Sequence, residues 1–142
     1  MTSARPADME LAAAGTTLSE AFARAALAVL ALAVDPDGVV ERDVREVRAH
    51  GSTLESLLAQ WIAECLYVYE VEGFVWRRLD FVVFDTEPKA GGEPLRLHAF
   101  LHGEELDPDR HAVVTQIKGG SPRNVMIRPV QGGFEVSLEV PT

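Results

Sequence analysis

The segment HGEELDPDRH, residues 102–111, holds four carboxylates and two histidines around one proline. Several carboxylate oxygens together are the ligands that calcium prefers. An EF-hand loop beginning at Asp107 would need Gly at its sixth position and Glu at its twelfth, where this sequence has Ala112 and Lys118. That kind of calcium loop is therefore excluded. From its residues alone, the block is expected to form a proline-stiffened turn between two strands, with its charges in water.

The loop KGGSPR, residues 118–123, is a second candidate for chemistry. Two glycines after a strand let the backbone turn tightly and bring its N–H groups close to an anion. A lysine and an arginine flank the glycines, so the loop could hold a phosphate or a carboxylate of a partner. An ordinary Gly-Gly turn is the alternative.

Other chemistry finds little support. His98 and His102 lie four apart on an expected strand, which separates them by about 13 Å, too far for one metal ion. We expect both to be surface imidazoles. Cys65 lies in an apolar helical stripe, where a thiol is usually inert. Trp61 and Trp76 are expected to be anchors in the core or at its rim. No phosphate-binding glycine motif and no H-E-x-x-H is present, and one cysteine makes no thiolate zinc site.

The elements that must position these groups follow from periodicity. Capping boxes at Thr17/Glu20 and Ser52/Glu55 predict the starts of two helices, the first apolar nearly all round and the second amphipathic. The two starts, GTTLSEAF and GSTLESLL, are 36 residues apart and reflect an internal repeat or the same capping chemistry. Strands are expected over residues 7–14, 39–51, 74–85, 94–104, 111–118 and 134–140, with 125–127 as a further candidate.

This order, β-α-β-α-β-β-β-β, predicts one α+β domain over residues 1–142, with a mostly antiparallel sheet and two helices packed on one face. The chain carries 22 acidic against 13 basic residues, a net charge of −9. This balance argues against direct nucleic-acid binding and favours docking to a basic partner. The single cysteine, the lack of a signal-like N-terminus and the lack of a long apolar run predict a cytoplasmic protein without membrane contact. We also expect a monomer or weak dimer.

Several segments, in the same order along the chain, resemble the archease family. That family has a His-Thr-Ala-Asp segment, a Gly-x-Thr-Leu before an Ala-rich helix, a Leu-Leu-x-x-Trp helix, a Gly-Glu-x-hydrophobic-Asp-x-x-Arg-His signature, a lysine-led loop, and a final Leu-Asp-Ile strand. The matching residues here are RPAD (5–8), GTTL (15–18), LLAQWIAECLY (57–67), GEELDPDRH (103–111), Lys118 and LEV (138–140).

The resemblance implies an accessory protein rather than a catalyst. Archeases activate the RNA ligase that joins 3′-phosphate or 2′,3′-cyclic-phosphate ends to 5′-hydroxyls, as in tRNA splicing, by promoting its guanylylation and repeated turnover. They bind a divalent cation, usually calcium, which here would be held by Asp8, Glu139 and the carbonyl of Val140. Lys118 would be the essential lysine. The other positions implicated in function or in contact with the ligase are Ser121, Arg123, Glu104, Asp107, Arg110 and His111.

Three departures bear on these expectations. Arg5 stands where the family has histidine, residues 118–123 replace Lys-Ala-Val-Thr-x-His, and Glu139 is one methylene longer than aspartate, so any cation site must shift or weaken. The first alternative is therefore a non-catalytic binding or chaperone-like module with a decayed metal site. The second is an enzyme that uses Asp107, Asp109 and His111 as an acid–base set, although no nucleophile accompanies them.

Overall fold

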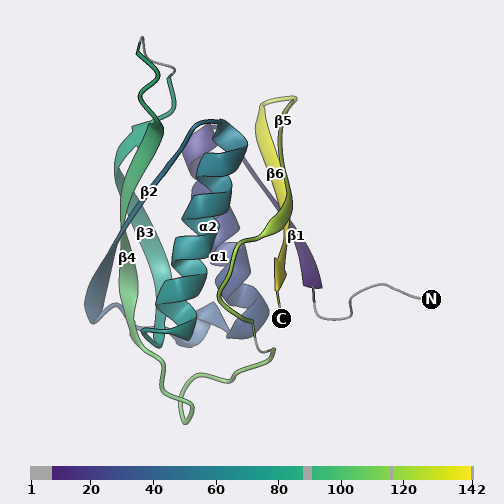
Figure 1. The fold of residues 1–142 in the computed structure, drawn as a ribbon. Helices are drawn as coiled ribbons and strands as arrows, with labels where there is room; N and C mark the ends of the chain where they lie inside the picture. Colours follow the sequence, from purple (N-terminus) through teal and green to yellow (C-terminus); the bar gives the residue numbers. More distant parts are fainter. Residues whose placement is uncertain (1–7, 88–90, 116, 142) are drawn as a thin grey trace, which may run out of the picture.

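In the computed structural model, which describes residues 8–87, 91–115 and 117–141, two helices lie between two three-stranded antiparallel sheets (Figure 1). None of the described helices is long and apolar enough to cross a membrane. The elements, in chain order, are β1 (Asp8–Gly15), α1 (Leu18–Ala33), the short 3-10 helix η1 (Pro36–Gly38), β2 (Asp43–Gly51), α2 (Leu54–Glu70), β3 (Phe74–Asp85), β4 (Leu95–Glu105), β5 (Arg123–Val130) and β6 (Gly133–Pro141).

The strands are divided between two sheets with the orders β1-β6-β5 and β2-β4-β3. The α+β class and the order of elements are confirmed, and each sheet has the helices on one of its faces. The division into two sheets was not anticipated. It arises because β1 pairs with β6, from Asp8 opposite Pro141 to Gly15 opposite Phe134, which joins the two ends of the described chain.

Both helices begin after a strand that ends in glycine. Thr17 caps α1 as predicted, because its Oγ1 accepts a hydrogen bond from the Glu20 N–H at 3.1 Å. The predicted cap of α2 at Ser52 is wrong by one residue. Thr53 is the N-cap, and its capping box partner is Ser56 rather than Glu55.

The two turns share one geometry. A Cβ added at Gly15 would lie 2.5 Å from the Ala21 nitrogen, and one added at Gly51 would lie 2.5 Å from Ser56 Oγ. Each strand therefore passes so close to the first turn of its helix that only glycine fits. This shared turn accounts for the similarity of the two segments 36 residues apart.

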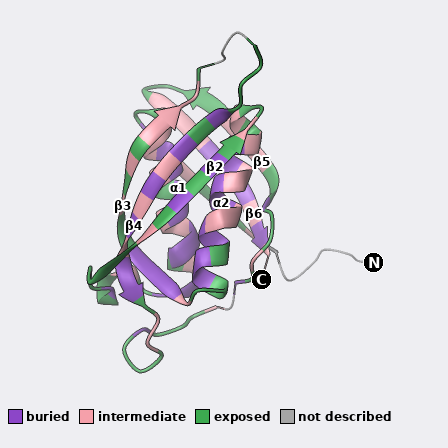
Figure 2. Ribbon diagram, turned by 60° about the vertical axis from the view of Figure 1, so that its left-hand side comes forward, coloured by how far each residue is buried: buried purple, intermediate pink, exposed green. Residues whose placement is uncertain are grey.

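The core lies around α1 and α2 (Figure 2). Both tryptophans are fully buried in it, which decides for the core between the two expected places, core and rim. Trp61 Nε1 donates to the carbonyl of Phe22 at 3.0 Å, and Trp76 Nε1 donates to the carbonyl of Ala26 at 3.3 Å. Phe22 and Ala26 are one helical turn apart. The indoles thus fix α1 against α2 and against β3 at two successive turns.

The strand predicted over residues 111–118 is wrong. In the described part of this segment, only Val113 pairs in β fashion, through an isolated bridge to Val34, and the Val114 N–H donates to the carbonyl of Ala33 at 2.7 Å. The segment crosses the end of α1, and its described residues form no ladder of strand pairs. The candidate strand at 125–127 is confirmed within the longer β5.

Candidate functional site at the end of strand β6

Residues from three distant parts of the sequence meet at the end of β6. In the register of the sheet, Asp8 of β1 lies opposite Pro141, and Arg123 of β5 lies opposite Glu139. The Lys118 N–H donates to the carbonyl of Pro141 at 3.1 Å. The backbone positions of Asp8, Lys118 and Glu139, which the sequence analysis proposed for the site, therefore lie near one another in the structure.

Glu139 and Val140 belong to opposite faces of this sheet, because side chains alternate along a strand. Val140 is fully buried, whereas Glu139 is partly exposed on the outer face. Glu10 of β1 lies directly opposite Glu139 and is exposed on the same face. Two like charges opposite each other destabilise a sheet, so the pair favours a neighbouring cation. The side chain of Asp8 lies outside the described part of the structure.

Asn124 holds the Glu139 carboxylate from the other side. Its Nδ2 donates to Glu139 Oε2 at 2.8 Å. Asn124 has a φ of 52°, in the left-handed region that asparagine tolerates better than most residues, and lies at an irregularity in the register of β5. A cleft of about 330 Å³ opens here, lined in part by Glu10, Asn124, Met126 and Glu139.

Sequence reasoning missed Glu10 and Asn124. Glu10 could have been found, because it lies two residues after Asp8 on an expected strand and must share its face. Asn124 could not, because its contact with Glu139 depends on the bulge in β5.

The donors at this end of the sheet fit a hard cation in kind, since carboxylate and carbonyl oxygens are calcium ligands. The described side chains are too few for a complete site. Among the described residues, no three His, Cys, Asp or Glu side chains lie close enough together to hold one metal ion. Glu139 and Glu10 supply two carboxylates, so a full site requires Asp8 or backbone carbonyls as well.

The loop that carries Lys118 packs against the end of α2. Lys118 is exposed and lines a cleft of about 360 Å³ together with Tyr69, Glu70 and other residues. A Cβ at Gly119 would lie 2.8 Å from Glu70 Oε1, and Gly120 has a φ of 134°. The backbone conformation therefore favours glycine at Gly120, whereas the contact at Gly119 is with the end of an exposed side chain that can move. Ser121 is exposed beside them.

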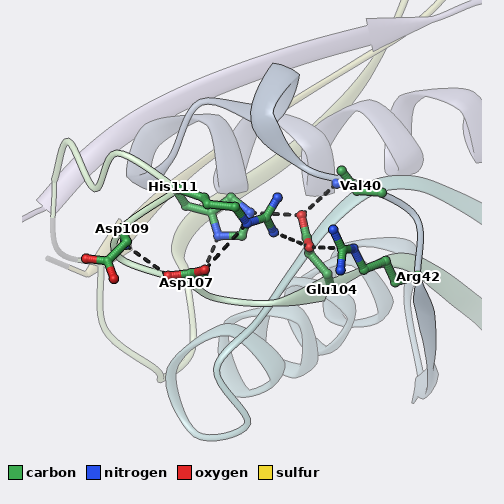
Figure 3. A network of polar contacts seen from close by, with 7 residues as sticks. Val40, Arg42, Glu104, Asp107, Asp109 and His111 are labelled. Carbon is green, nitrogen blue, oxygen red and sulfur yellow. Dashed lines mark hydrogen bonds and ion pairs between the residues drawn. The ribbon is translucent and has the colours of Figure 1, made fainter.

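The acidic block forms a separate network around Glu104, at the end of β4 (Figure 3). Glu104 is 4% exposed, and its Oε2 accepts hydrogen bonds from the Val40 N–H at 2.7 Å and from His111 Nε2 at 3.0 Å. Its Oε1 accepts from Arg110 and lies 3.4 Å from Arg42 Nε. Burial alone would raise the pKa of Glu104, but the hydrogen bonds from Val40, His111 and Arg110 outweigh it and lower the pKa to about 2.

His111 is 1% exposed and uses both ring nitrogens within this network. Its Nδ1 accepts from the Asp107 N–H at 2.8 Å, so the proton of the neutral ring lies on Nε2, which donates to Glu104. Asp107 in turn accepts from the Asp109 N–H at 3.0 Å. Arg110 and His111 thus brace the end of β4 against the segment before β2. The enzyme hypothesis loses its general base, because a buried imidazole with both nitrogens bonded cannot reach a substrate.

The remaining candidates have structural roles. His102 Nε2 lies 2.9 Å from Asp80 Oδ2, and His98 Nε2 lies 3.1 Å from Glu46 Oε2, so each imidazole has its own carboxylate neighbour and the two do not share a ligand. Cys65 is free and fully buried, and burial raises the pKa of its thiol well above the usual value.

Fold and site together define a class: an α+β protein whose first and last described strands pair and place acidic residues beside a lysine-bearing loop. The model of the archease protein family (MTH1598/TM1083) matches residues 2–140. Protein archease of Pyrococcus abyssi is 31% identical over 135 residues, 95% of this chain and 92% of that protein. Protein archease of Methanosarcina mazei is 31% identical over 134 residues, 94% and 89% of the two chains. The chain belongs to the archease family.

A solved structure supports the fold. The solution structure of Methanobacterium thermoautotrophicum protein 1598 superposes with a TM-score of 0.71 at 22% identity, covering 98% of this chain and 95% of that one. At this level of identity the likeness concerns the fold.

Proposed function

We propose that this protein is an accessory activator of an RNA ligase in tRNA splicing or RNA repair, and that it promotes guanylylation and multiple turnover of the ligase. Membership of the archease family supports the accessory role. The observation that carries the proposal is the meeting of Asp8, Glu139, Arg123 and Lys118 at one end of a sheet. A site with both acidic and basic groups at a surface is suited to act on a partner's charged ligand rather than to enclose its own.

In this proposal, Asp8, Glu139 and the carbonyl of Val140 hold a divalent cation, with calcium the expected ion. When bound, such an ion neutralises negative charge, which at a nucleotide site favours phosphoryl transfer. Two further residues of the chain would support the bound cation. Glu10 opposite Glu139 adds negative charge to the outer face, and Asn124 restrains the longer glutamate side chain. The net charge of −9 speeds encounter with a basic, RNA-binding ligase.

The test is a single-turnover guanylylation assay with the ligase of the same organism, with and without this protein and calcium. We expect stimulation by the intact protein, and its loss in Asp8→Ala, Glu139→Ala and Lys118→Ala. Glu55→Ala, which removes an exposed glutamate from the first turn of α2, serves as the control and leaves stimulation unchanged. Absence of stimulation by intact protein in the presence of calcium overturns the proposed function.

Thermal unfolding tests the cation separately. Calcium at a hundred times its dissociation constant adds about 2.7 kcal/mol to native stability, which raises Tm by roughly 8 °C in a domain of this size. We expect this rise in the intact protein and in Lys118→Ala, but not in Glu139→Ala. Stimulation without any rise in Tm would refute the cation site but keep the activator role. Absence of both would leave the binding or chaperone-like module, which the replacement of aspartate by Glu139 favours.

A further inference from the structure

A second cleft, of about 390 Å³, opens on the opposite sheet, β2-β4-β3. Along β4, Leu95 and Leu97 are buried, whereas the alternate residues Arg96 and His98 face outward, so the cleft lies on the outer face of this sheet, the face turned toward the viewer in Figure 2. Four basic side chains line it, and none of the described residues in its lining is acidic: Arg48, His50, Arg96 and His98 supply the basic groups.

These basic groups form two cross-strand pairs on the same face of the sheet, with the inward-facing pair of Ala49 and Leu97 between them. Arg48 lies opposite His98, and His50 lies opposite Arg96. Basic groups directly opposite each other weaken strand pairing when both are charged. Glu46 offsets the charge of the first pair, and a bound anion would offset the charge of the second.

Two of the four side chains keep their donors available. Glu46, two residues before Arg48 on β2 and outside the lining of the cleft, lies 3.4 Å from Arg48 Nε and 3.1 Å from His98 Nε2. The side chains of His50 and Arg96, by contrast, form no hydrogen bond or ion pair with the described residues. Both are exposed. Asp85, the last residue of β3, lies opposite Arg96 in the register of the sheet and is not part of the lining of the cleft.

The cleft also has apolar walls, formed by the half-buried Val83 and by Pro94. Its volume falls within the range of about 300–1,000 Å³ that small-molecule sites occupy. An arginine guanidinium binds phosphate through two parallel hydrogen bonds, and histidine and arginine planes stack on flat rings. We infer that the cleft binds an organic phosphate monoester with a flat apolar body, in the size class of a mononucleotide.

This inference is independent of the proposed function. It concerns the sheet that does not contain β6, requires neither cation nor ligase, and can be tested on the isolated protein. A phosphate monoester on a flat ring system occurs both in a free mononucleotide and in the terminal nucleotide of a single strand. The test distinguishes these two ligands.

The test is isothermal titration of the intact chain with GMP, guanosine and inorganic phosphate, supported by NMR of the imidazole protons of His50 and His98. We expect GMP to bind, and guanosine and phosphate each to bind at least about tenfold more weakly, because each lacks one half of the recognition. Arg96→Gln should weaken GMP binding at least about tenfold. Arg77→Gln removes an exposed arginine of β3 outside the cleft and should leave binding unchanged.

Three results would overturn the inference: no binding of GMP at millimolar concentration, phosphate binding as tightly as GMP, or equal weakening by Arg77→Gln and Arg96→Gln. A hexanucleotide with a 3′-phosphate that competes with GMP identifies a strand end as the source. A hexanucleotide that does not compete identifies the free mononucleotide.

Discussion

Glu104 is the residue whose replacement has the most calculable effect. Folding lowers its pKa from 4.5 to about 2, because hydrogen bonds from Val40, His111 and Arg110 favour the charged form more than burial disfavours it. At about 1.4 kcal/mol per pKa unit, this shift corresponds to about 3 kcal/mol of native stability. Since the folded pKa lies below the unfolded one, the stabilisation is complete above pH 4.5 and is lost as the pH falls toward 2.

Glu104→Gln keeps the shape of the side chain but removes its charge and turns an NH₂ group toward donors. We expect it to cost about 3 kcal/mol at pH 7, and the difference from the native protein to shrink to near zero between about pH 5 and pH 2. Urea denaturation, followed by tryptophan fluorescence at a series of pH values, measures this difference. The exposed neighbour Glu105→Gln is the matched control and should cost little at any pH. A Glu104→Gln deficit that persists undiminished at low pH would contradict the assigned role of the carboxylate.

Two further predictions concern packing. Gly15→Ala places a methyl group against the first turn of α1 and should lower the free energy of unfolding by about 2–3 kcal/mol in urea denaturation. Gly92 has a φ of 74° but open space around it, so Gly92→Ala should lower this free energy by about 1 kcal/mol. A larger loss in Gly92→Ala than in Gly15→Ala would show that the close approach at Gly15 is not rigid. Cys65 should react with a thiol reagent only when the protein unfolds, so that its labelling rate rises with urea in step with unfolding. Rapid labelling in native buffer would contradict the burial of this residue.

Much of the fold could be predicted because its signals are local. Periodicity and capping residues locate both helices, although Ser52, Thr53, Glu55 and Ser56 offer two overlapping capping boxes and only the structure selects the second. The division of the strands into two sheets depends on which distant strands pair, and no local pattern carries that information. The segment 111–118 has a strand-like pattern, but it lies against the end of a helix.

The candidate site shows the same division. Resemblance to a family located Asp8, Glu139 and Lys118, and the register of the sheet places their backbones together. The spacing of Glu10 from Asp8 places both on one face of the expected strand, and only the register shows that Glu10 lies opposite Glu139. The buried state of Glu104 depends on the backbone N–H of Val40, 64 residues earlier in the chain, which side-chain motifs do not report.

The central position of β6 in its sheet has a consequence for biosynthesis. β1 leaves the ribosome first, but its only strand partner in the described structure is β6, which follows more than a hundred residues later. The β2-β4-β3 sheet has all its strands by Glu105 and can assemble while translation continues. A nascent chain therefore acquires the candidate β6 site only after β6 has been synthesised, and a transcript truncated before β6 yields a product that lacks the site.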